Sequence, residues 1–275
     1  MTAIIVIKRG GRRSLLQWLF PDYRSVTYGT REVGDRLFQF LLCEVELPDR
    51  PGKRCYTKIK KRIVETLMQY DCRKLFVYDP AGTALKRELE EYGFETPGAG
   101  PLKQQLFEKM LDFALKRKDG AVERAALVDY EGSFQSEKLL YRLCQKFRYV
   151  TLITANPTYF ERVAEEIMEE MGLAIQITGE EKEELSCGVY VLVSGGERTL
   201  YRYAKNRKNI VLCMSEESQM NFIGLRNIWR RPVVRLPQEL MCDFPAEITD
   251  TQAAELMAAD GVEGLSEIVE IVGNH

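Results

Sequence analysis

Residues 124–156 alternate between apolar and amphipathic segments in an order that few folds allow. Residues 124–129 (RAALVD) are a short apolar run that ends in a carboxylate, and residues 130–135 (YEGSFQ) follow as a turn. Residues 136–148 have helical periodicity, and residues 149–154 (YVTLIT) are the next apolar run. A strand, a tight turn, a helix and a second strand in this order predict half of a doubly wound α/β sheet.

The same alternation extends along the rest of the chain. Thr158 and Glu161 match a capping box, and Gly172 is a suitable terminator for the helix that would begin there. Its apolar stripe includes Tyr159 and Met168. Further strands are predicted at residues 3–7, 25–28, 38–45, 74–78, 173–178, 189–193, 210–214 and 233–236, and further helices at residues 56–70, 83–92, 102–118, 253–258 and 265–271.

A cluster of helix and strand breakers at residues 96–101 (TPGAGP) suggests a domain boundary. We therefore expect an α/β domain at residues 1–98 and a second α/β domain at residues 99–275. The helix at residues 102–118 would connect the two halves, and the last helices would form a C-terminal tail.

Composition restricts the class of protein. The chain has 275 residues, 45% of them hydrophobic and 29% charged, with a net charge of −2. These values are ordinary for a soluble globular protein and disfavour general nucleic-acid binding, which usually needs an excess of positive charge. No apolar run approaches the roughly 20 residues that cross a bilayer. The first charges follow the apolar stretch at residues 3–7, the reverse of a secretory signal, so we expect no membrane association and a cytoplasmic location.

Cysteine and histidine usage narrows the chemistry. The seven cysteines are widely spaced without a CxxC pair, which predicts free thiols and no zinc ribbon. The single histidine is His275, so a Ser-His-Asp centre or a His-ligated metal inside the fold is excluded. The acidic run at residues 180–184 lacks the alternating oxygen donors of a calcium loop and is interpreted as a solvated face. We therefore expect no metal, and the sequence assigns no catalytic residue.

The turn from Asp129 to Ser136 is the first candidate site. Ligands of open α/β sheets bind at the carboxyl ends of strands, so Ser133, Gln135 and backbone N–H groups at the start of the following helix could hold an anion here. Gly132 is the one glycine where a dinucleotide fingerprint has three, and bulkier side chains would block close approach of a pyrophosphate. The alternative is a structural turn in which backbone donors satisfy the carboxylate of Asp129.

The following units add a resemblance to a known superfamily. Residues 150–156 (VTLITAN), an amphipathic helix and residues 188–196 (GVYVLVSGG) resemble the Rossmann domains of NAD(P)-dependent dehydrogenases, among them shikimate dehydrogenases and glutamyl-tRNA reductases. The resemblance covers about residues 122–215 and rests on pattern, because the glycine fingerprint is absent. It implies a doubly wound, mainly parallel sheet and NADP as the cofactor.

The resemblance also implies roles for individual residues. Asn156 stands where the ribose is read, and Arg162, one turn into the helix, could meet a 2′-phosphate. Ser194 and Gly195 would face the same crevice. In the alternative interpretation Arg162 is a surface residue paired with Glu165 or Glu166, and Gly195 belongs to an ordinary turn.

Two basic segments are further candidates. Arg9, Arg12 and Arg13 surround a glycine pair directly after the first predicted strand, which suits either an anion cradle or a solvated basic hairpin. Residues 226–231 combine arginines with Trp229 and could form a partner surface or stack on a base. The alternative for Trp229 is an anchor between a helix and the sheet.

Three functions follow from these patterns. The missing fingerprint favours a degenerate, non-catalytic Rossmann-like protein with a regulatory or assembly role, which predicts a protein partner or a homo-oligomer. An NADP-dependent oxidoreductase is the second hypothesis. A sensor of a small phosphorylated metabolite, held by Arg9, Arg12 and Arg13, is the third.

Overall fold

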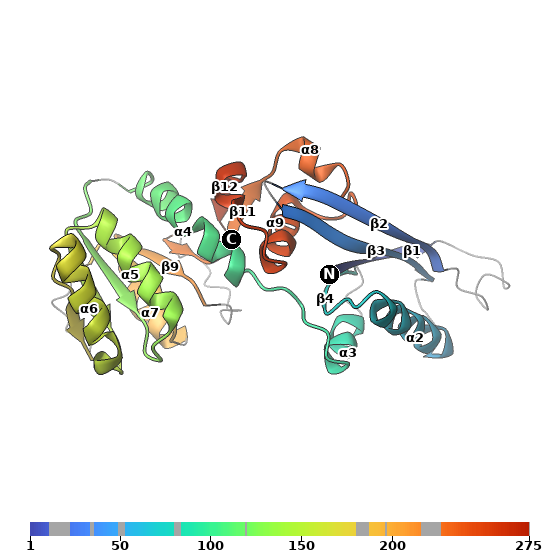
Figure 1. Cartoon of the computed structure of the whole chain (residues 1–275), viewed down its shortest axis with the longest axis horizontal. Helices are drawn as coiled ribbons and strands as arrows, with labels where there is room; N and C mark the ends of the chain where they lie inside the picture. The colour runs from blue at the N-terminus through green and yellow to red at the C-terminus, as the bar shows by residue number, and fades with distance from the viewer. Residues whose placement is uncertain are drawn as a thin grey trace. The chain divides into compact units, whose positions relative to one another are not determined.

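The computed structural model of the protein describes residues 1–10, 23–33, 36–48, 53–79, 84–118, 120–179, 187–195, 197–215 and 227–274. Its contacts divide the chain into two compact units (Figure 1). The first unit comprises residues 1–105 and 234–270, and the second comprises residues 106–233 and 271–275. Within the described ranges, no helix is long and apolar enough to span a membrane.

The first unit is built on a four-stranded mixed sheet with the order β2-β3-β1-β4. β1 pairs in parallel with both β3 and β4, whereas β2 and β3 form an antiparallel pair. The strands are β1 (Thr2–Gly10), β2 (Tyr23–Val33), β3 (Arg36–Pro48) and β4 (Lys74–Tyr78).

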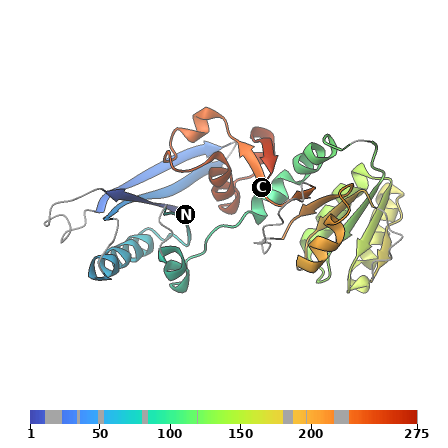
Figure 2. The same cartoon turned by 180° about the vertical axis from the view of Figure 1, so that it is seen from behind.

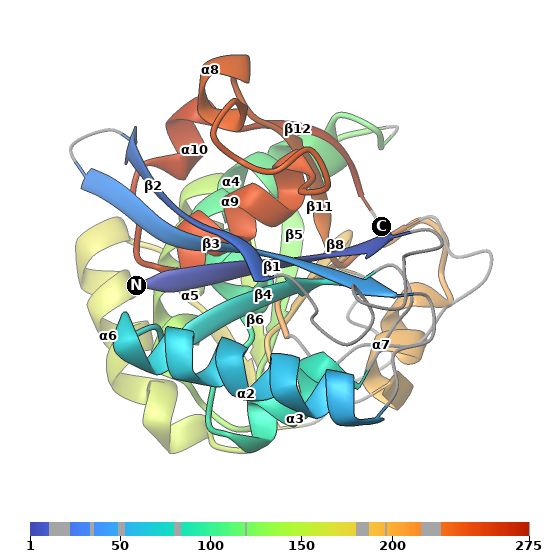
Figure 3. The same cartoon turned by 90° about the vertical axis from the view of Figure 1, so that its right-hand side faces the viewer.

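Helices α2 (Lys53–Gln69) and α3 (Leu85–Glu91) cover one face of this sheet (Figure 3). Alternate residues of a strand point to the same face, so Ala3, Ile5 and Ile7 of β1 share one core with α2 and α3. The helix residues of this core recur at helical spacing: Ile59, Ile63, Val64 and Leu67 of α2, and Leu85 and Leu89 of α3.

The C-terminal part of the chain folds with this first sheet. The ring of Phe244 stacks on the ring of Phe40 in β3, with centroids 5.1 Å apart, and lies 6.1 Å from the ring of Phe38. Thr2 donates a hydrogen bond to Asp260 over 2.9 Å. The short elements of this part are α8 (Gln238–Met241), α9 (Asp250–Ala259) and α10 (Leu265–Ile268).

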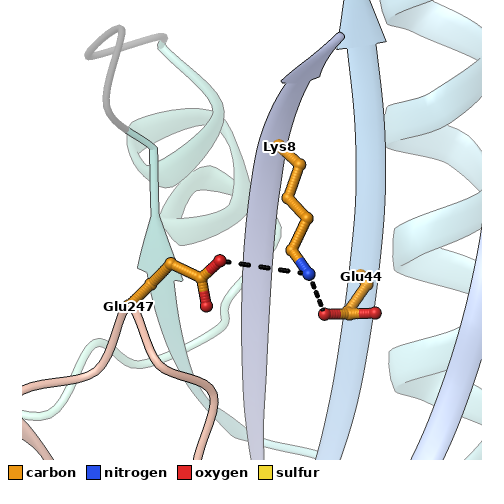
Figure 4. Close-up of polar contacts among 3 residues, drawn as sticks. All are labelled: Lys8, Glu44 and Glu247. Atoms are coloured by element: carbon orange, nitrogen blue, oxygen red, sulfur yellow. Dashed lines mark hydrogen bonds and ion pairs between the residues drawn. The ribbon is translucent and has the colours of Figure 1, made fainter.

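A charged contact adds to this attachment. The ammonium group of Lys8 in β1 lies between the carboxylates of Glu44 and Glu247 (Figure 4). It donates a hydrogen bond to Glu44, and 3.9 Å separates it from Glu247. Because the three side chains are partly exposed, we expect this network to contribute less than the aromatic stack.

The second unit is built on a parallel six-stranded sheet with the order β10-β9-β8-β5-β6-β7 (Figure 2). Numbered along the chain from β5, this order is 6-5-4-1-2-3, the arrangement of a doubly wound Rossmann sheet. The strands are β5 (Arg124–Val128), β6 (Tyr149–Ile153), β7 (Gln176–Thr178), β8 (Val189–Leu192), β9 (Ile210–Cys213) and β10 (Ile228–Trp229).

Four helices accompany this sheet. α5 packs on β5, β6 and α6, and α7 contributes Leu200, Tyr203 and Ala204 to a core with Ala126 and Val128 of β5. The helices are α4 (Gly100–Leu115), α5 (Phe134–Lys146), α6 (Pro157–Met171) and α7 (Glu197–Ala204). A separate two-stranded sheet pairs β11 (Pro232–Arg235) with β12 (Glu270–Asn274).

The α/β fold class with a doubly wound second half is confirmed. Two local predictions were wrong at the ends of helices. Asn156 is the N-cap of α6 without a side-chain cap bond, because Pro157, whose φ suits a helix start, already occupies the first turn ahead of Thr158. The helix predicted at residues 265–271 ends at Ile268, since the chain turns extended at Val269 and enters β12.

The apolar stripe of α6 is also narrower than predicted. Phe160, Val163 and Ile167 are buried, whereas Tyr159 is 42% and Met168 52% exposed. These two residues flank the buried stripe. The predicted helical periodicity is therefore correct, but the predicted apolar stripe was too wide.

The compact units divide the chain differently from the predicted domains. The first unit continues past the breaker cluster to residue 105, within α4, and it includes residues 234–270, which the sequence prediction assigned to the second half. The physical reason is the aromatic stack of Phe244 on Phe40, a contact between residues about two hundred positions apart that no local pattern reveals.

Replacing Phe244 with alanine tests this attachment. Phe244 is 6% exposed, and truncation of a buried phenylalanine costs about 3–5 kcal/mol, so we expect the free energy of unfolding of the first unit to fall by about 3 kcal/mol. Urea denaturation followed by circular dichroism measures this loss. Met68→Ala, at a side chain that is 61% exposed in the same unit, is the matched control and should change stability by under about 0.5 kcal/mol. Equal stability of the two variants would contradict the attachment.

Candidate functional site at the carboxyl edge of the second sheet

The strand order of the second sheet reverses between β5 and β8, which are hydrogen-bonded neighbours. Ligands of doubly wound sheets bind beyond the carboxyl ends of the strands at such a switch point. Asp129 directly follows β5, and Ser194 lies two residues beyond the end of β8. Sequence and topology thus bring these two predicted site residues to the same edge.

The carboxylate of Asp129 is the centre of this edge and is fully buried. Its Oδ1 accepts hydrogen bonds from the backbone N–H groups of Glu131, over 3.1 Å, and of Gly132, over 3.2 Å. Its Oδ2 accepts from the hydroxyl groups of Ser136, over 2.6 Å, and of Ser133, over 3.2 Å. The backbone and hydroxyl donors of the turn therefore all point to one carboxylate of the same turn.

Ser194 joins the ends of the two central strands. Its hydroxyl group donates to Oδ1 of Asp129 over 2.9 Å and accepts from the backbone N–H of Tyr130 over 2.7 Å. The hydroxyl group is thus both a donor and an acceptor across the switch point. This pair fixes the β5–α5 turn against the strand that follows the crossover.

These contacts determine the charge state of Asp129. Burial by itself raises the pKa of the carboxyl group, since it disfavours the charged form. The hydrogen bonds from Ser136, Ser194 and the backbone of Glu131 and Gly132 outweigh burial, so the pKa lies below its ordinary value. Asp129 is therefore an anion at neutral pH.

The space above Gly132 is filled by residues from the start of α6. The φ of Gly132 is +78°, a conformation that L side chains rarely adopt. A Cβ atom placed there would lie 3.5 Å from the ring of Tyr159 and 3.8 Å from the amide nitrogen of Asn156. The hydroxyl group of Tyr159 donates to Glu137 of α5 over 2.9 Å, which ties the two helix starts together. The ring of Tyr159 consequently covers the turn.

The remaining predicted residues of the crevice have other contacts. Arg162 forms an ion pair with Glu166 over 3.3 Å and is largely exposed, as the surface interpretation predicted. Gly195 has a φ of +111°, and a Cβ atom there would lie 3.2 Å from the side chain of Thr199 in α7. The structure brings Asp129, Gly132, Ser133, Ser194 and Asn156 together and leaves Arg162 on the surface.

Sequence reasoning assigned no role at this site to two of its residues. Ser136 makes the shortest hydrogen bond to Asp129, and Tyr159 covers Gly132. The spacing of Ser136 from Ser133 is the signal that could have identified the first, because Ser133 is the N-cap of α5 and accepts from the Ser136 backbone. No sequence signal marks Tyr159, since its role depends on how α6 packs.

The two basic candidates have different outcomes. Arg12 and Arg13 lie outside the described residues, as does the side chain of Arg9, so the anion cradle stays a prediction. Trp229 belongs to β10, and its ring contacts the ring of Phe113 in α4 edge-on, with centroids 5.4 Å apart. This contact matches the anchor interpretation of Trp229. Arg226 lies outside the described residues.

Metal-ligand and thiol chemistry are not evident in the parts of the chain that the structure describes. Among those residues, no three histidine, cysteine, aspartate or glutamate side chains gather as ligands, and residues 180–184 fall outside them. Cys72 and Cys144 are free and buried, and burial raises the pKa of each thiol to about 11. Such thiols are poor nucleophiles at neutral pH.

Comparisons with known proteins give distant matches. No family model matches the chain, and no curated protein matches its sequence. Among solved structures it is similar to quinate dehydrogenase from Corynebacterium glutamicum in complex with NAD, at 11% identity and a TM-score of 0.33 over 77% of this chain and 79% of that one. It is also similar to ligand-free aspartate transcarbamoylase from Trypanosoma cruzi, at 15% identity and a TM-score of 0.33 over 94% and 82% of the two chains.

A shikimate 5-dehydrogenase from Mycobacterium fortuitum is a third match, at 11% identity and a TM-score of 0.31, with 79% of this chain and 80% of that chain covered. TM-scores this low carry no conclusion about activity. The strand order of the second sheet is what establishes the Rossmann-like fold.

Asp129→Asn tests the charge state of the turn. A group with a depressed folded pKa stabilises the protein above its unfolded pKa, near 3.9, and this contribution is lost as the pH falls through the folded pKa. We expect the variant to be less stable than the parent by about 2–3 kcal/mol at pH 7, because the hydroxyl and N–H donors lose a charged acceptor. The difference should shrink below about pH 4. Urea unfolding of both proteins from pH 7 to pH 2.5 measures it, and a pH-independent difference would rule out a depressed pKa.

Proposed function

We propose that this chain is a non-catalytic Rossmann-like protein with a regulatory or assembly role, whose switch-point turn serves structure instead of cofactor binding. The observation that carries the proposal is the carboxylate of Asp129, buried among donors from its own turn. In a dinucleotide-binding turn, backbone N–H groups at this position face a phosphate. Here the N–H groups of Glu131 and Gly132 already have an anionic partner.

Electrostatics oppose a second anion at the same place. A pyrophosphate over the turn would compete with Asp129 for the same two N–H groups and would lie close to a buried, ionised carboxylate. Like charges in a medium of low dielectric constant repel strongly. Displacing the carboxylate would leave it buried without its donors, which is costly.

Steric cover acts in the same direction. Close approach of a pyrophosphate to the backbone needs open space above the glycine of the turn. The ring of Tyr159 and the amide of Asn156 occupy the space above Gly132. The hydrogen bond from Tyr159 to Glu137 holds that cover in place.

Exposed aromatic residues beside the closed turn suit a protein partner. Phe134, the first residue of α5, is 65% exposed, and Tyr159 is 42% exposed. Aromatic residues are enriched in protein interfaces. A regulatory or assembly role would use this surface, either with another protein or with a second copy of the chain.

The second candidate is an NADP-dependent oxidoreductase, which the strand order favours, since dinucleotides bind to sheets of this order at the switch point. It requires Asn156 and Arg162 at the adenosine end of the cofactor. It also requires Tyr159 to move off Gly132.

A thermal-shift measurement with NAD and NADP separates the two candidates. A dinucleotide with a Kd of about 10 µM would stabilise the folded protein by about 2.7 kcal/mol at ~1 mM ligand, which corresponds to a rise in Tm of roughly 5–10 °C. We expect no rise with either dinucleotide, because the N–H groups of Glu131 and Gly132 are bonded to Asp129 and the ring of Tyr159 covers Gly132. A dehydrogenase of known affinity serves as the positive control.

Variants identify the site if binding is found. A rise in Tm that Gly132→Val abolishes would place the cofactor over the turn and would overturn the proposal. A rise that Gly132→Val leaves unchanged would locate binding elsewhere and would leave the structural role of the turn intact.

A further inference from the structure

A pocket lies at the amino edge of the second sheet, the opposite end of β5 from Asp129. Its volume is about 340 Å³, within the range of small-molecule sites. Its lining comes from the segment before β5, from the start of β8 and from the loop before β9: Lys118, Ala121, Val122, Glu123, Arg124, Cys187, Gly188, Asn206, Lys208 and Asn209. All of these residues belong to the second unit.

Positive charge dominates this lining. Lys118, Arg124 and Lys208 are cationic, and Glu123 is the one carboxylate among the lining residues. Arg124 is held over the ring of Tyr149, with its guanidinium carbon 5.0 Å from the ring centroid. The pocket is therefore suited to an anionic ligand.

Lys118 is the residue that distinguishes the pocket from an ordinary basic surface. Its ammonium group is half-buried and donates to the backbone carbonyl of Gly188 over 3.1 Å, its one hydrogen bond among the described residues. An ammonium group has three N–H donors, so two remain for a ligand once the contacts of the described residues are counted. Burial lowers the pKa of Lys118, because it disfavours the charged form.

Gly188 lies against the ammonium group of Lys118 and leaves space for it because it has no side chain. A Cβ atom on Gly188 would lie 2.8 Å from the ammonium nitrogen of Lys118 and 2.5 Å from a methyl group of Val122. A side chain at this position would require Lys118 or Val122 to shift. The missing side chain of Gly188 thus leaves room for a cation whose partner, in the part of the chain that the structure describes, is a neutral carbonyl.

We propose that this pocket binds the oxyanion of a small molecule, a phosphate or a carboxylate group, with Lys118 as the principal contact and Arg124 and Lys208 at the rim. A bound oxyanion would offset the unfavourable burial of the ammonium group and would accept its two remaining N–H donors. The site is independent of the switch-point turn and does not rest on its function.

Isothermal titration calorimetry of the full chain at low ionic strength tests the site, with inorganic phosphate and sodium acetate as probes in separate titrations. We expect saturable binding of at least one probe. Lys118→Met should weaken it by about tenfold or more, because a hydrogen-bonded charge is lost. Lys116→Met is the matched control, since Lys116 is exposed nearby, outside the lining, and it should bind as the parent does.

The two probes distinguish the class of ligand, and the variants locate the site. Binding of phosphate alone identifies a phosphorylated ligand, and binding of acetate alone identifies a carboxylate. Lys208→Met, at an exposed lining residue, should cause a smaller loss and provides a second variant if Lys118→Met unfolds. Absence of binding by the parent, or equal affinity of the parent and both lining variants, would overturn the proposal. Equal affinity would place the anion elsewhere, for example at Arg9, Arg12 and Arg13.

Discussion

The second unit depends on one buried charge. Asp129 stands at the end of the first strand of a doubly wound sheet, where other proteins of this architecture leave backbone donors free for a phosphate. Its carboxylate binds two backbone donors, the N–H groups of Glu131 and Gly132, and also the hydroxyl groups of Ser136 and Ser194. A charge so fully hydrogen-bonded can be buried without the penalty that an unpaired carboxylate would incur. The hydrogen bonds of Asp129 hold the turn without a ligand, and a ligand would add few of the bonds that the turn needs.

The two edges of the sheet therefore contrast. At the carboxyl edge an anion from the chain itself satisfies the local donors. At the amino edge Lys118 is half-buried with a neutral carbonyl as its partner among the described residues. On the account proposed above, a cation in this position would gain from an external anion, whereas the ionised carboxylate of Asp129 would oppose one at the carboxyl edge. The distribution of satisfied and unsatisfied charge, more than the fold, separates the two sites.

Much of this organisation could be predicted from the sequence. Apolar runs located the strands of the first sheet and β5 to β9 of the second, because a buried parallel strand is apolar on both faces. They did not reveal β10, which has two residues, and the run at residues 233–236 belongs to the separate sheet of β11 and β12. One of the two interpretations of the turn, in which backbone donors satisfy the carboxylate of Asp129, agrees with the hydrogen bonds from Glu131 and Gly132. The contact of Phe244 with Phe40 could not be predicted, since it joins distant segments. The position of the Tyr159 ring over Gly132 could not be predicted either, because it depends on how α6 packs against the turn.

The most direct test of the central claim is amide hydrogen exchange at Glu131 and Gly132, followed by NMR in the unliganded protein. If the carboxylate of Asp129 holds these two N–H groups, both should exchange much more slowly than amides of an open surface turn, and addition of NADP should leave their rates unchanged. Rapid exchange in the free protein, followed by protection when NADP is added, would show that the donors await a phosphate and would contradict the account.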